Sequence, residues 1–132
     1  MAFFRPRVSR EAEVRYHADI EISKTFPELL GKAREAEQTV RDLRAAQADD
    51  LELMAAGQAF DKALTEALRG AEAGQRATFG VKAYDDRIAR RKAKATPAGA
   101  EWSAEVERLR TLREENRLWG IPRLPRPVPS SY

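Results

Sequence analysis

The stretch that decides the fold is residues 96–119, TPAGAEWSAEVERLRTLREENRLW. Its large apolar residues recur at three- and four-residue steps, which is the spacing of one face of an α-helix. Thr96 followed by Pro97 is typical of a helix start, because threonine caps the first turn and proline needs no hydrogen-bond partner there. The stretch therefore predicts an amphipathic helix whose stripe is Trp102, Val106, Leu109, Leu112, Leu118 and Trp119.

Similar stripes precede it along the chain. Residues 53–68 carry one built from Leu53, Phe60 and Leu64, and residues 29–43 form a coiled-coil-like seam of about two heptads. Ser9 is placed to cap a first helix that ends near residue 24. We therefore expect an all-α protein of four or five elongated helices, with the helical region spanning 9–119. Breaks are expected over 70–78, where Gly70 and Gly74 disfavour helix, and at 96–97.

Both ends predict extended segments rather than helices. Residues 1–8 place Phe3 and Phe4 before Arg5-Pro6-Arg7, and residues 120–132 contain four prolines and two arginines. Proline at that density forbids a helix and favours polyproline II, which has no internal hydrogen bonds. An N-terminal arm and a C-terminal tail of this kind are expected to order against neighbouring subunits.

The composition limits the size of a core that the chain could form on its own. The 132 residues are 42% hydrophobic, but 23 of them are alanine, which leaves few large side chains for a core. We expect the apolar stripes to be covered either by a partner or by one another, as in a helical-bundle adaptor. No run is apolar enough to span a membrane, and the chain has no cysteine, which excludes disulfides and thiol catalysis.

The charge of +3 is unevenly distributed. Arginines crowd both ends, and residues 87–94 hold five cations without an acid, at Arg87, Arg90, Arg91, Lys92 and Lys94. Such a run suits an acidic protein surface or nucleic acid, although a solvated helix face is the plain alternative. No aromatic residue lies within the run, so stacking on single-stranded bases is not indicated.

No catalytic or metal-binding pattern is visible. His17 is the single histidine, and the adjacent carboxylates at 49–50, 85–86 and 114–115 point in different directions on a helix. We expect no enzyme activity, no cofactor and no metal.

The candidate functional residues are therefore those expected to bind partner proteins. They lie in the arm, the basic run, the last helix and the tail: Phe3, Phe4, Arg5, Arg7, Arg87, Arg90, Arg91, Lys92, Lys94, Trp102, Trp119, Ile121, Pro122, Arg123, Leu124, Pro125, Arg126 and Pro127.

The chain as a whole resembles the small helical proteins bound to ciliary doublet microtubules, especially those inside the tubule. The resemblance rests on Ala/Arg/Glu-rich helices without cysteine, the arm Phe3-Phe4-Arg5-Pro6, and Arg117-Leu118-Trp119-Gly120 before a Pro/Arg tail. It implies a non-enzymatic staple on acidic tubulin and other helical accessory proteins, in the cytoskeleton of the axoneme.

Other assemblies use proteins of the same style. The alternatives are an accessory subunit of a mitochondrial ribosome or respiratory complex, a nucleic-acid-associated protein, or a phage structural protein.

Overall fold

The computed structural model describes residues 8–120 and confirms an all-α fold. Five α-helices follow one another, and two short turns accompany them, a 3-10 turn η1 after α3 and a π-helical turn η2 after α5. Their bounds are α1 Arg10–Lys24, α2 Phe26–Ala45, α3 Asp50–Phe79, η1 Val81–Tyr84, α4 Arg87–Lys94, α5 Pro97–Glu115 and η2 Asn116–Gly120.

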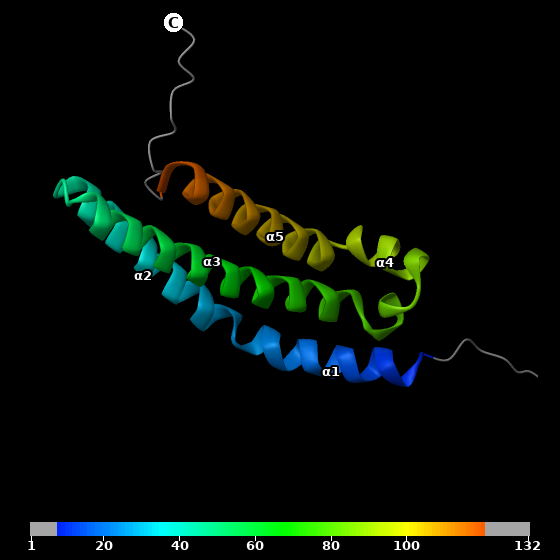
Figure 1. Ribbon diagram of the computed structural model, residues 1–132. Helices are drawn as coiled ribbons and strands as arrows, with labels where there is room; N and C mark the ends of the chain where they lie inside the picture. Colours follow the sequence, from blue (N-terminus) through cyan, green and yellow to red (C-terminus); the bar gives the residue numbers. More distant parts are fainter. Residues whose placement is uncertain (1–7, 121–132) are drawn as a thin grey trace, which may run out of the picture.

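The long helix α3 lies at the centre of the arrangement (Figure 1). Helices α1 and α2 run one after the other along one side of it, so that α2 faces its N-terminal half and α1 its C-terminal half. Helix α5 runs back along the other side of α3, and the short α4 lies at the end where α3 finishes.

Side-chain caps set most of the helix starts. The hydroxyl of Ser9 accepts a hydrogen bond from the Ala12 N–H at 3.0 Å, and that of Thr96 accepts one from the Gly99 N–H at 3.1 Å. Asp49 caps α3 in the same way, which separates α3 from α2. These caps satisfy N–H groups that have no partner inside a helix.

The break expected over 70–78 does not form, because α3 continues through both glycines to Phe79. At Gly70, the space a Cβ would occupy lies 3.3 Å from side-chain atoms of Phe26 and Leu29. At Gly74, the same space lies 2.5 Å from the indole ring of Trp102. The glycines therefore allow neighbouring helices to approach α3 closely, and that packing offsets their cost to the helix.

One hydrophobic core joins the three long helices. Leu64 of α3 and Val106 and Leu109 of α5 are the largest fully buried side chains, and Val40 of α2 and Phe60 of α3 belong to the same cluster. The part of the predicted stripe within α5, from Trp102 to Leu112, therefore packs on the stripe of α3 within the chain. The stripe does not extend to Leu118, which lies in the π-helical turn η2 and is 52% exposed. The sequence left open whether a partner or another helix of the same chain covers these apolar stripes. In the described residues, the helices of the chain cover one another.

Candidate partner-binding surface

The basic run of residues 87–94 forms helix α4. The carboxylate of Asp86 accepts hydrogen bonds from the N–H groups of Ile88 and Ala89 and so starts the helix. Ala89 and Ala93 are half-buried toward the bundle. Because the half-buried residues of α4 are small, its long side chains stay exposed, although that of Arg90 also borders a cavity described below.

The five cations of α4 are all exposed to solvent: Arg87, Arg90, Arg91, Lys92 and Lys94. Within residues 8–120, none of them forms an ion pair or a side-chain hydrogen bond. Arginines elsewhere in the bundle, such as Arg108 and Arg117, are paired with carboxylates. The charge of α4 is therefore available to a partner.

A partly buried polar cluster, centred on the buried Asp19, joins α1, α3 and η1 beside α4. Asp19, only 7% exposed, accepts hydrogen bonds from Nε and Nη2 of Arg76 at 2.8 and 3.0 Å and from the Tyr84 hydroxyl at 2.5 Å. Burial acts to raise the pKa of the Asp19 carboxyl, but these hydrogen bonds and the Arg76 charge together hold the pKa below its ordinary value. Burial, with the hydrogen bond and charge of Asp19, raises the pKa of Tyr84.

Next to this cluster, a cavity of about 90 Å³ opens between α1, the end of α3, η1 and α4. Arg15, Arg76 and Arg90 line it together with Phe79, Ala83 and Tyr84. The sequence analysis missed Arg15 and Arg76, because these arginines lie far apart in the chain and only the packing of three helices brings them together.

Trp102 contributes to the interior of the bundle and also to its surface. Its ring meets Phe26 edge-on with ring centres 5.5 Å apart, and it covers Gly74. The same two aromatic rings and Leu30 line an open groove between α2 and α5, flanked by charged residues such as Arg34. The half-buried indole is therefore already engaged within the chain, while one side of it borders the groove.

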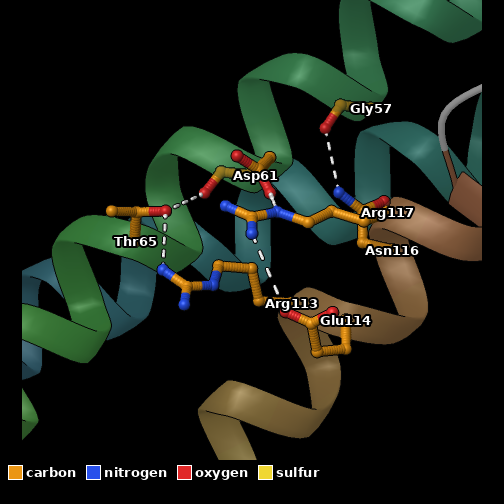
Figure 2. Close-up of polar contacts among 7 residues, drawn as sticks. All are labelled: Gly57, Asp61, Thr65, Arg113, Glu114, Asn116 and Arg117. Atoms are coloured by element: carbon orange, nitrogen blue, oxygen red, sulfur yellow. Dashed lines mark hydrogen bonds and ion pairs between the residues drawn. The ribbon is translucent and has the colours of Figure 1, made fainter.

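A polar cluster holds the end of α5 and the turn η2 against α3 (Figure 2). The buried Asn116 donates a hydrogen bond from its amide to the Gly57 carbonyl at 3.0 Å. Arg117 pairs with Asp61 at 2.7 Å. These contacts hold η2, the turn that precedes the proline-rich tail.

The remaining predicted partner-binding residues lie outside the described residues. These are Phe3, Phe4, Arg5 and Arg7 of the arm, the tail residues 121–127, and the side chain of Trp119. Their role in binding stays a prediction.

No family model, curated protein or solved structure matches this chain. Among residues 8–120, no helix is long and apolar enough to cross a membrane, and no group of His, Asp or Glu side chains is arranged to hold a metal ion. Functional assignment therefore rests on the surfaces described above.

Proposed function

We propose that the protein is a non-enzymatic structural subunit that binds an acidic surface of a larger assembly through helix α4. The observation that supports this most directly is the set of five exposed, unpaired cations on a helix of eight residues. Complementary charge of this kind speeds association and disfavours wrong partners.

The bundle behind α4 supports the same proposal. Because the apolar stripes of α3 and α5 cover each other, the folded chain can present α4 in a defined place. The half-buried Ala89 and Ala93 and the Asp86 cap fix the orientation of the helix, so less ordering is needed on binding. The arm and the tail would add contacts of their own.

The surface of a doublet microtubule is the first candidate partner, since the chain resembles small axonemal proteins and tubulin is acidic. Cytoskeletal or ciliary localisation follows from that proposal, and a mitochondrial assembly is the alternative location. Nucleic acid is the second candidate partner, because phosphates would also pair with the free cations of α4.

The test is co-sedimentation of the full-length protein with polymerised microtubules at low and moderate salt. We expect saturable binding that a triple variant, Arg87→Gln, Arg91→Gln and Lys92→Gln, abolishes. A matched triple variant, Lys32→Gln, Lys62→Gln and Arg69→Gln, removes three exposed charges from α2 and α3 and should bind normally.

Three results would change the assignment. Equal binding by both triple variants would exclude α4 as the binding surface. Competition by short DNA or RNA duplexes, with a steep loss in salt, would favour nucleic acid. Absence of binding at either salt would remove the microtubule and direct attention to ribosomes and respiratory complexes. A truncation after residue 119 reports separately on the tail.

A further inference from the structure

The cavity beside α4 brings together three arginines from three helices. Arg15 comes from α1, Arg76 from the last turn of α3 and Arg90 from α4. Its remaining lining is Phe79, Ala83 and Tyr84. A small concave site lined by three cations differs from the rest of α4, where Arg87, Arg91, Lys92 and Lys94 are exposed and line no part of this cavity.

The donors in this cavity are only partly used. Arg76 donates hydrogen bonds from Nε and Nη2 to Asp19, which leaves Nη1 free to donate another. Arg15 lies over the Tyr84 ring at 5.6 Å, and within residues 8–120 neither it nor Arg90 has an ion-pair partner. Among the three arginines, only Arg76 forms an ion pair with a described residue, Asp19, so the cavity carries an excess of positive charge.

Nearby carboxylates are occupied elsewhere. Asp85 accepts a hydrogen bond from the Ser9 N–H at 3.2 Å, and Asp86 caps α4. Glu72 pairs with Arg110 on the α5 side. The Glu72 charge also acts on Arg76, but among the described residues Asp19 is the carboxylate that forms an ion pair with an arginine of the cavity.

Asp19 also organises the cavity. By holding Arg76 and Tyr84 at once, it fixes a guanidinium and an aromatic ring on adjacent walls. This ordering is established before any ligand arrives, so binding would not have to restrain either side chain.

We propose that this cavity is a binding site for a tetrahedral oxyanion of the phosphate class. Guanidinium groups form charge-assisted hydrogen bonds with phosphate oxygens, and three of them on different sides match a tetrahedral dianion better than a planar carboxylate. The volume of about 90 Å³ holds one such group but is well below that of a drug-sized ligand site. The source is either free inorganic phosphate or a phosphoryl group carried on a larger molecule.

The site overlaps the proposed partner-binding surface at Arg90 alone, because the other four cations of α4 do not line the cavity. Arg90 is shared, but Arg91 and Lys92 are not part of the cavity. A variant that loses phosphate binding but keeps partner binding, or the reverse, would show that the phosphate site and the partner-binding surface act separately.

The experiment is an NMR titration of the full-length, ¹⁵N-labelled protein, following the arginine Nε–H signals. The probes are inorganic phosphate and O-phosphoserine, with acetate and chloride at matched ionic strength as controls. We expect saturable shifts at Arg15, Arg76 and Arg90 with phosphate, in the millimolar range, and little change with acetate. Binding of O-phosphoserine at the same arginines would indicate a carried phosphoryl group, and binding of inorganic phosphate alone would indicate the free anion.

Matched variants complete the test. Arg15→Gln and Arg90→Gln should each weaken phosphate binding by about tenfold or more, since each removes a charge-assisted contact. Arg91→Gln removes the same charge from α4 outside the cavity and should leave the affinity within about twofold. Circular dichroism checks that each variant is folded. Uniform shifts across all exposed arginines, equal binding of acetate, or an equal effect of Arg91→Gln would overturn the proposal.

Discussion

Replacing Gly74 by alanine tests the packing of α5 on α3 most sharply. A Cβ at this position would lie 2.5 to 2.7 Å from three carbons of the Trp102 ring, whereas real Cβ contacts essentially never fall below 3.0 Å and are mostly longer than 3.4 Å. The indole must therefore move by roughly 1 Å, away from a position where it also contacts Phe26. Overpacking of this kind costs about 1–3 kcal/mol.

The helix propensity acts in the opposite direction. Alanine is favoured over glycine inside a helix by about 1 kcal/mol. For Gly74→Ala we expect a net loss of about 1–2 kcal/mol in the free energy of unfolding, measured by urea denaturation followed by circular dichroism. Gly31 of α2 has no atom within 4 Å of the added methyl group, so Gly31→Ala should instead gain about 0.5–1 kcal/mol.

A double-mutant cycle isolates the contact. In a Trp102→Leu background the ring is gone, and Gly74→Ala should become stabilising by up to about 1 kcal/mol. The coupling energy between the two positions is then about 2–3 kcal/mol. If Gly74→Ala stabilised the wild-type chain as much as Gly31→Ala does, the close approach of Trp102 to α3 would be refuted.

Three further changes probe other parts of the bundle. Leu109→Ala should lower the free energy of unfolding by about 2–5 kcal/mol in urea, because Leu109 is 0% exposed, and a loss below about 1 kcal/mol would mean that the core is not closed there. Gln47 lies in the turn just after α2 and has a positive φ of 54°, so Gln47→Gly should stabilise the protein by up to about 1 kcal/mol, whereas a loss would argue against that turn. The pKa of Asp19 is lower in the folded than in the unfolded chain, so the ionised carboxylate stabilises the folded protein. This contribution to the free energy of unfolding is present above about pH 4 and is lost as the pH falls below that value. Between pH 5 and pH 3, the free energy of unfolding measured in urea should therefore fall less for Asp19→Asn than for the wild type. An equal fall for both proteins would contradict the contacts of Asp19 with Arg76 and Tyr84.

Several helix boundaries could be predicted because local chemistry sets them. Ser9 and Thr96 cap the helices expected to follow them, and Pro97 stands in the first turn, where it needs no donor. The apolar stripe of α5 was also visible, since Val106 and Leu109 recur at helical spacing and both are buried. These features depend on residues within a turn or two of one another.

The candidate site was predicted only in part. The basic run of α4 was visible because five of its eight residues are cations. The orientation of this helix depends on the half-buried Ala89 and Ala93, which have helical spacing but are too small to mark an apolar face in the sequence. The arm and tail residues stay predictions, since they lie outside residues 8–120.

By itself, the sequence determined that the chain is helical, where several helices start, and where its free positive charge is concentrated, because each follows from neighbouring residues. Only the tertiary structure decided that α3 continues through Gly70 and Gly74, since the cost of glycine depends on which side chains pack against it. It also decided that Asp19 binds an arginine 57 residues away and that three distant arginines line one cavity. Those contacts join separate helices, and no local pattern specifies which residues meet across a bundle.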